Sequence, residues 1–310
     1  MKTAILFPGQ GSQYVGMGHQ FYQEFQEAKE VYEKADVILG FPLSKLCFDG
    51  PEDQLRITMY TQPAIYVTSL AIWEVVKKLG IMADFMAGHS LGEYTALTAA
   101  ESIPYEEALK LVEKRGLFME EAVPHGEGTM AAVMGMDREE LEMVCHKVTE
   151  EGHVVELANM NSPGQIVISG TKRGVELASQ RAKEKGARRI IPLSVSGPFH
   201  SRLMKPARDR LQPLVANLKI KEPQTPVVMN VTALAETEPM RIKSNLIEQV
   251  VSPVLWSESI EWMIHQGVDT FIEVGPSKVL TGLVKKINRN VTTYSIEDLE
   301  SFDQFQKGWR

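Results

Sequence analysis

The stretch AGHSLGEYTA, residues 87–96, places a serine between two glycines in the pattern Gly-x-Ser-x-Gly. A short apolar segment, ADFMA, precedes the serine, and a run of helix-forming residues follows it. A nucleophile elbow needs this order of strand, serine and helix, because its sharp turn lifts the hydroxyl above the sheet. Ser90 is therefore a candidate nucleophile. The alternative is a serine that only caps the helix, a position that serine often occupies.

A serine hydroxyl is a weak nucleophile until a base takes its proton. Among the seven histidines, His200 stands just after the expected strand RRIIPLSVS and Gly197-Pro198. Loops after strand ends are where α/β proteins collect catalytic groups, so we expect His200 to be the base. His89 adjoins Ser90, but neighbours across a sharp turn point apart. We therefore expect His89 to support the site without touching the reacting atoms.

The loop FPGQGSQ, residues 7–13, raises the question of a nucleotide site. Position 14 is tyrosine, and Met17-Gly18 stands where a phosphate-binding loop needs lysine and a hydroxyl residue, so both nucleotide motifs fail. A tight loop after the first strand can instead supply one backbone N–H to a developing oxyanion. The N–H of Leu91 would then be the second donor.

Arg115 stands in the segment KRGLF, with apolar residues on both sides. A buried guanidinium needs an anion, and a carboxylate matches its planar fork with two hydrogen bonds. If Arg115 faces Ser90, the substrate should therefore carry a carboxylate. The alternative is an ordinary solvated helix charge, which is the usual state of arginine.

Strand-like and helix-like segments alternate along most of the chain, which predicts a parallel α/β sheet. The expected strands cover residues 3–7, 83–87 and 270–274, and the expected helices cover residues 62–79, 91–100, 105–123 and 278–287. Residues 126–196 differ, because they follow the order β-α-β-β-α-β of a ferredoxin-like module. We therefore predict a core formed by residues 1–125 and 197–310, with a subdomain inserted at 126–196.

Composition limits the class of protein. The 310 residues are 44% hydrophobic and carry a net charge of −7, so a globular protein without a general affinity for nucleic acid is expected. Only two cysteines occur, and the N-terminal MKTAILFPGQG lacks the apolar run of a signal peptide, so we expect a cytoplasmic protein. No apolar run approaches the roughly 18 residues of a membrane helix. No metal-binding spacing of His or Cys occurs, so no metal is expected.

The chain resembles the malonyl-CoA:acyl carrier protein transacylase family from residue 3 to about 289, through the ordered segments FPGQGSQ, TQPAI, GHSLGEY, VEKRG, ANMNSPGQIVISG, PLSVSGPFHSRLMKP, EQVVSPVLW and FIEVGPSKVLTGLVKKI. The resemblance implies an α/β-hydrolase-like core with an inserted ferredoxin-like subdomain. It also implies malonyl transfer from malonyl-CoA to the phosphopantetheine thiol of an acidic acyl carrier protein, with coenzyme A as the released product. This ping-pong reaction passes through a malonyl-serine and implies no metal or redox cofactor.

By the same resemblance, Ser90 is the acylated nucleophile and His200 its base. Gln10 and Leu91 would form the oxyanion hole, and Arg115 would bind the malonyl carboxylate. Gln249 would orient the histidine through its backbone carbonyl, and Phe199 would be the side chain typical of malonyl-specific members. The chain departs from the family at Ser277, in GPSK where GPGK is common, and in the segment AESIPY, where Glu101 replaces a small residue.

Three other functions stay open at this point. The first is an acyltransferase that acts in trans in a polyketide pathway. The second is a serine esterase or thioesterase, which an acidic residue bonded to His200 and a neutral acyl pocket would favour. The third is a carrier-binding module without catalysis, which an intact Ser90 and His200 argue against.

An acidic carrier protein requires a basic surface on this negatively charged chain. The candidate cations form two groups along the sequence, Lys183, Lys185, Arg188 and Arg189 in the first and Arg202, Lys205 and Arg208 in the second. The alternative is an ordinary solvated face.

Overall fold

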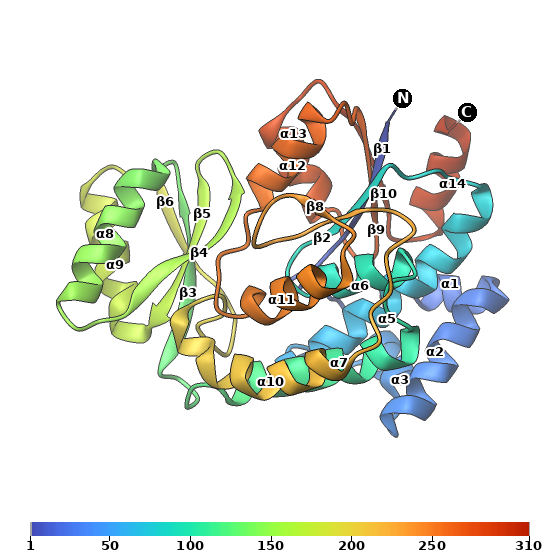
Figure 1. Cartoon of the computed structure of the whole chain (residues 1–310), viewed down its shortest axis with the longest axis horizontal. Coiled ribbons are helices and arrows are strands. Elements are labelled where there is room, and N and C mark those ends of the chain that lie inside the picture. Colours follow the sequence, from blue (N-terminus) through green and yellow to red (C-terminus); the bar gives the residue numbers. More distant parts are fainter. Residues whose placement is uncertain (1, 310) are drawn as a thin grey trace.

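The computed structural model describes residues 2–309 and contains two separate β-sheets (Figure 1). The larger sheet is parallel except for its last pair, and its six strands lie in the order β10 (Thr292–Ile296), β9 (Thr270–Val274), β1 (Thr3–Phe7), β2 (Phe85–Gly88), β7 (Val227–Val228) and β8 (Ala235–Glu236). The smaller sheet is antiparallel and has the order β4 (Val155–Ser162), β5 (Gln165–Thr171), β3 (Gly128–Met134) and β6 (Arg189–Pro192). The predicted fold class, an α/β-hydrolase-like core with a ferredoxin-like subdomain, is confirmed.

Strand β1 lies inside the larger sheet, between β9 and β2. All five of its residues are buried, as expected of a parallel strand whose two faces are covered by helices. In the parallel register Phe7 is opposite Gly88, so β1 and β2 end at the same level. The loop after β1 and the turn at Ser90 are therefore brought to one edge of the sheet.

Helices cover the larger sheet and fill the N-terminal and C-terminal thirds of the chain. In chain order they are α1 (His19–Glu24), α2 (Gln26–Leu39), α3 (Leu43–Asp49), α4 (Glu52–Leu55), α5 (Thr58–Val76), η1 (Lys77–Leu79), α6 (Gly92–Ala99), α7 (Tyr105–Glu121), η2 (Arg202–Met204), α10 (Lys205–Asn217), α11 (Pro239–Gln249), α12 (Trp256–His265), α13 (Val279–Ile287) and α14 (Leu299–Gly308). Strand 3–7, strand 270–274 and the helix expected at 278–287 agree with the structure to within one residue.

The helix expected at 62–79 differs most from its prediction. The expected start at residue 62 places Pro63 in the first turn, but the helix begins at Thr58, so Pro63 lies inside it. Lys77–Leu79 continue as a 3₁₀ turn. The sequence predicts a single apolar face for this helix, formed by Ile65, Ile72, Val75, Val76 and Leu79. That prediction is wrong, because α5 is buried on nearly every side, with α2 and α7 packed against it. A helix that is apolar all round belongs inside a protein, and α5 forms part of the core beside the sheet.

In Figure 1 the smaller sheet lies to the left of the larger one, together with helices α8 (Arg138–Glu150) and α9 (Lys172–Glu184). Both helices pack against strands of this sheet, and the strand order is that of a ferredoxin-like module. Strand β6 ends at Pro192, so most of the segment expected to extend it to Ser196 is loop. The boundaries at residues 126 and 196 stay a prediction.

Strand β4 joins the smaller sheet to the core. The backbone N–H of Met160 donates to the carbonyl of Val254 at 2.9 Å, and the N–H of Val254 donates to the carbonyl of Ala158 at 2.8 Å. The segment around Val254 therefore adds to the edge of β4 like a short extra strand. This contact fixes the orientation of the loop that follows α11.

Candidate active site

Ser90 occupies a sharp turn between β2 and α6. Its φ of 52° lies in the left-handed region, which residues with a side chain rarely adopt. The two glycines of the motif permit the turn, since a Cβ on Gly88 would lie 1.8 Å from the carbonyl oxygen of Gly92, and a Cβ on Gly92 would lie 2.2 Å from that of Phe7. The serine side chain makes no helix cap, and Leu91 occupies the N-cap position of α6. The turn therefore has the geometry of a nucleophile elbow.

Asn230 braces this elbow from the loop after β7. Its Oδ1 accepts the backbone N–H of Ser90 at 2.8 Å, and its Nδ2 donates to the carbonyl of Gly88 at 2.8 Å. The N–H of Asn230 in turn donates to Oε2 of Glu93 at 2.5 Å. Burial raises the pKa of Glu93 to about 8. Sequence reasoning missed both residues, and the only local signal was the place of Glu93 at the start of the helix expected at 91–100.

His200 reaches Ser90 from the loop after β6. The Ser90 hydroxyl lies 2.7 Å from His200 Nε2, and His200 Nδ1 lies 2.9 Å from the backbone carbonyl of Gln249. A carbonyl can only accept, so Nδ1 carries the proton and Nε2 is free to accept the hydroxyl proton of Ser90. Burial, together with the positive charge of Arg115, lowers the pKa of His200 to about 3. The imidazole is therefore a neutral acceptor at neutral pH.

Arg115, on α7, reaches the Ser90 hydroxyl from the protein interior and is only 1% exposed. One guanidinium nitrogen donates to Oε1 of Gln62 at 2.7 Å, and the other donates to Oε1 of Gln249 at 2.8 Å and to Oγ of Ser90 at 3.2 Å. Within residues 2–309, Nε has no hydrogen-bond partner and no carboxylate lies within ion-pair distance of Arg115. The site thus holds a buried cation that is bound by neutral amides.

A cavity of about 380 Å³ opens above Ser90 and His200, and Gln10, His89 and Phe199 line it. The side chain of Gln10 donates to Thr58 at 3.2 Å, away from Ser90. The backbone N–H groups of Gln10 and Leu91 donate to no acceptor in the part of the chain that the structure describes. Gln10 lines the cavity and Leu91 directly follows Ser90, which also lines it, so these two free N–H groups are candidates to bind an oxyanion formed at the serine.

His89 lies beside the elbow but points away from the serine hydroxyl. Its Nε2 is 2.9 Å from Oδ1 of Asn161, and its ring packs at 5.4 Å from that of Trp256. Burial lowers the pKa of His89, so a neutral ring fills this position. Phe199 precedes His200 and is buried against the core.

The two groups of basic residues differ in their surroundings. Arg202 pairs with Glu156, and Lys205 and Arg208 pair with Asp209. Lys183, Lys185, Arg188 and Arg189 are exposed, and none of them has an acidic partner within 4.0 Å among residues 2–309. The group formed by Lys183, Lys185, Arg188 and Arg189 is therefore the stronger candidate for binding an acidic partner, because no described carboxylate neutralises its charge.

The described residues, 2–309, hold no cluster of His, Cys, Asp or Glu side chains arranged to bind a metal ion. Nor do they include a helix with the length and apolar character that crossing a membrane requires.

Comparisons with known proteins show the family of this chain. The family model described as acyl transferase domain matches residues 5–303. The malonyl CoA-acyl carrier protein transacylase of Bacillus subtilis (strain 168) is 54% identical over 302 residues, which cover 97% of this chain and 95% of that protein. The crystal structure of the Clostridium perfringens transacylase of the same name has a TM-score of 0.95 and 45% identity, and covers 99% of this chain and 97% of that one.

A further solved structure shows a malonyl-transacylase in complex with its type II PKS acyl-carrier protein. That chain has a TM-score of 0.97 and 41% identity, and the match covers 99% of this chain and 100% of that one.

Proposed function

Because this chain belongs to the acyl transferase family of malonyl CoA-acyl carrier protein transacylases, we propose that its Ser90–His200 pair performs the malonyl transfer. The chain transfers malonyl from malonyl-CoA to acyl carrier protein and so supplies fatty-acid synthesis. One observation supports the assignment most strongly. The Ser90 hydroxyl lies 2.7 Å from a neutral histidine and 3.2 Å from a buried arginine that has no carboxylate partner among residues 2–309.

In the first half-reaction His200 Nε2 takes the hydroxyl proton while Ser90 Oγ attacks the thioester carbonyl of malonyl-CoA. The backbone carbonyl of Gln249 holds the Nδ1 proton and so keeps the imidazole in the reactive tautomer. The N–H groups of Gln10 and Leu91 stabilise the tetrahedral oxyanion. When the intermediate collapses, the C–S bond breaks and coenzyme A leaves with the proton held by His200. Malonyl stays on Ser90 as an ester.

The second half-reaction reverses these steps with a new thiol. The phosphopantetheine thiol of the carrier protein gives its proton to His200, and its sulfur attacks the malonyl ester. Ser90 leaves and regains the proton from Nε2. Every step is an acyl or proton transfer between substrate and side chains, so the sequence of steps uses no metal or redox cofactor. The principal competitor is water, which the buried site must exclude.

Arg115 gives the site its preference for malonyl. A malonyl group on Ser90 carries its carboxylate close to the guanidinium, where two parallel hydrogen bonds replace the contact with Ser90 Oγ. Phe199 borders the cavity above Ser90 and His200 with an apolar surface.

An esterase or thioesterase is less consistent with the site. Such an enzyme commonly uses an Asp or Glu to orient the histidine, whereas a backbone carbonyl bonds His200 here. Its acyl pocket would also be neutral, and Arg115 is charged. A carrier-binding module without catalysis would not need the contact between Ser90 and His200.

The acceptor pathway has a second candidate, because one similar solved structure is a malonyl-transacylase with a type II PKS carrier. A competition between purified fatty-acid and polyketide carrier proteins, measured as kcat/KM for each, distinguishes the two. We propose a cytoplasmic site of action, since both cysteines, Cys47 and Cys145, are free and buried.

The direct test of the proposed function uses radiolabelled malonyl-CoA. Incubation without carrier protein should yield a labelled protein with the malonyl ester on the peptide that contains Ser90. Addition of carrier protein should then release the label as malonyl-carrier. Label that remains noncovalent, or that is released mainly as free malonate in the presence of carrier, would contradict a transacylase.

The acylation rate should depend on pH in a way that reflects the lowered pKa of His200. The ordinary pKa of histidine is about 6.5, and burial with the charge of Arg115 lowers it to about 3 here. Since the neutral imidazole is the base, kcat/KM for malonyl-CoA should stay level as the pH falls through 6.5. A decline centred near pH 6.5 in stopped-flow acylation would show that His200 is solvated and that the lowered pKa is wrong.

Charge reversal in the unpaired basic group, which is formed by Lys183, Lys185, Arg188 and Arg189, should weaken only the transfer of malonyl to carrier protein. We expect Lys183→Glu with Arg188→Glu to raise KM for carrier protein several-fold, because acidic carriers are attracted by exposed cations. KM for malonyl-CoA should not change. The matched control is Lys205→Glu, since Lys205 is already paired with Asp209. Equal KM values for carrier in wild type and the double variant would remove this surface from the docking face.

A further inference from the structure

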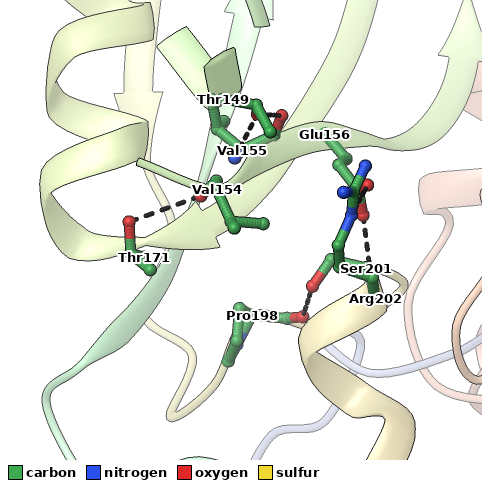
Figure 2. Close-up of polar contacts among 8 residues, drawn as sticks. All are labelled: Thr149, Val154, Val155, Glu156, Thr171, Pro198, Ser201 and Arg202. Carbon is green, nitrogen blue, oxygen red and sulfur yellow. Dashed lines mark hydrogen bonds and ion pairs between the residues drawn. The ribbon is translucent and has the colours of Figure 1, made fainter. Parts of the chain in front are cut away.

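The turn that carries His200 is bound to the antiparallel subdomain by one carboxylate. Oε2 of Glu156, on β4, accepts the backbone N–H of Arg202 at 2.8 Å, and Oε1 accepts a hydrogen bond from Nε of the same arginine. Figure 2 shows Glu156 on its strand in contact with Arg202 on the turn. Arg202 is two residues after His200, so Glu156 is hydrogen-bonded to the backbone of the turn itself.

This turn needs support from outside. His200 has a φ of 58°, in the left-handed region, and a residue with a side chain keeps such a conformation only when its surroundings enforce it. Within the turn, the hydroxyl of Ser201 donates to the carbonyl of Pro198 at 2.7 Å (Figure 2). The Glu156–Arg202 contact then fixes the chain on the other side of His200.

The strand beneath Glu156 is itself held firmly. Thr149 Oγ1, at the end of α8, donates to the carbonyl of Val155 at 3.0 Å and accepts its N–H at 3.1 Å. Thr171 Oγ1, at the start of α9, donates to the carbonyl of Val154 at 3.3 Å. These three bonds are drawn as dashed lines in Figure 2. The carboxylate therefore projects from a fixed backbone and not from a mobile loop.

The same strand also holds the other partner of the histidine. Through Ala158 and Met160, β4 pairs with Val254, five residues after Gln249. The carbonyl of Gln249 accepts the Nδ1 proton of His200 at 2.9 Å. Strand β4 thus positions both the turn that carries the imidazole and the loop that orients it.

Residues 197–201 of the turn are buried, whereas Arg202 at its end is exposed and borders open space. A cavity of about 310 Å³ lies next to His200, and its lining includes Glu156, Leu157, Arg202 and Ser252. A side chain that borders a cavity has lost part of its van der Waals contact there. The ion pair is also largely open to solvent, with the Arg202 side chain 63% exposed and that of Glu156 24% exposed, so its contribution to overall stability is small. Its main effect is on position.

We infer that Glu156, through its two bonds to Arg202, is a positioning residue that holds the turn of His200 at reacting distance from Ser90. This inference rests on the proposed role of His200 as the base. Its consequence is that the antiparallel subdomain, through β4, determines the alignment of the base as well as shaping the cleft.

The test compares four variants of the full chain. Glu156→Ala should lower kcat for malonyl transfer by about 10- to 100-fold, the size of effect that a small misplacement of a reacting group produces, with KM for malonyl-CoA unchanged. Glu156→Gln should restore most of kcat, because its amide oxygen can still accept the N–H of Arg202. Arg202→Ala keeps that backbone bond and should lose less activity than Glu156→Ala.

The matched control is Glu151→Ala, which breaks a two-point ion pair with Arg181, at 2.6 and 2.8 Å, elsewhere on the same subdomain. It should leave kcat unchanged and shift the thermal midpoint about as little as Glu156→Ala does. The imidazole NMR signals of His200 should change in Glu156→Ala and not in Glu151→Ala. Equal kcat in Glu156→Ala and wild type, or equal losses in Glu156→Ala and Glu151→Ala, would overturn the inference.

A Ser90→Ala variant separates this outcome from a failure of the proposed function. If Ser90→Ala still forms a malonyl-enzyme, the proposed nucleophile is wrong. If Ser90→Ala is inactive and Glu156→Ala is fully active, only the positioning role is wrong.

Discussion

Ser90→Ala should form no malonyl-enzyme and should lower kcat for transfer by about 10⁴-fold or more, as removal of the nucleophile does in enzymes of this chemistry. The fold should persist, because alanine is smaller than serine and the backbone bonds of Ser90 to Asn230 and Gln249 do not involve its hydroxyl. Rapid-quench measurement of protein-bound label checks whether the malonyl-enzyme forms, and thermal unfolding checks whether the fold persists.

His200→Ala should produce a loss of similar order, because the two residues act as one unit and their effects do not add. The double variant should be no worse than Ser90→Ala. The chain offers a matched control in His265, whose Nδ1 also contacts a backbone carbonyl, that of Glu261 at 2.8 Å, but on an exposed helix end. His265→Ala should transfer malonyl at the wild-type rate. A His200→Ala variant that still acylates rapidly would leave the base unassigned.

The parts of the site that could be predicted from sequence are those with a local cause. Gly88 and Gly92 flank Ser90 because any Cβ at either position would collide with the backbone. Five consecutive residues are therefore enough to predict the elbow. His200 was identified by its place after a strand, and the β-α-β-β-α-β order predicted the subdomain. Each of these signals lies within a short segment, where periodicity and turn chemistry decide the structure.

The parts that could not be predicted depend on contacts between distant segments. Asn230 reaches Ser90 across 140 positions of sequence, and nothing in its own neighbourhood marks it as a brace. The true start of α5 at Thr58 is fixed by a bond from its N–H to Glu120 at 3.1 Å, which no pattern near residue 58 reveals. Only the resemblance indicates that Gln249 orients His200, because every residue has a backbone carbonyl and the side chain does not show which carbonyl binds the histidine.

Arg115→Ala should remove the preference for malonyl-CoA over acetyl-CoA. A charged, two-point hydrogen bond typically contributes about 1.5–3 kcal/mol, which corresponds to a factor of about 10–150 in kcat/KM. Malonyl transfer should therefore fall by that factor relative to acetyl transfer, which has no carboxylate to lose. Arg115→Lys should recover only part of the preference, because an ammonium cannot reproduce the planar contact. The measurement is kcat/KM for both thioesters in each variant.

Without Arg115, the amide oxygens of Gln62 and Gln249 also lose their hydrogen-bond donor. The test therefore depends on the ratio of kcat/KM for malonyl-CoA to that for acetyl-CoA, and not on the malonyl rate alone. A second variant leaves the arginine in place. Gln62→Glu puts a carboxylate where the Gln62 amide oxygen now accepts from Arg115 at 2.7 Å, so it should occupy the guanidinium and raise KM for malonyl-CoA while acetyl-CoA is little affected. If both variants lower malonyl and acetyl transfer equally, Arg115 supports the fold of the site, and a different residue binds the malonyl carboxylate.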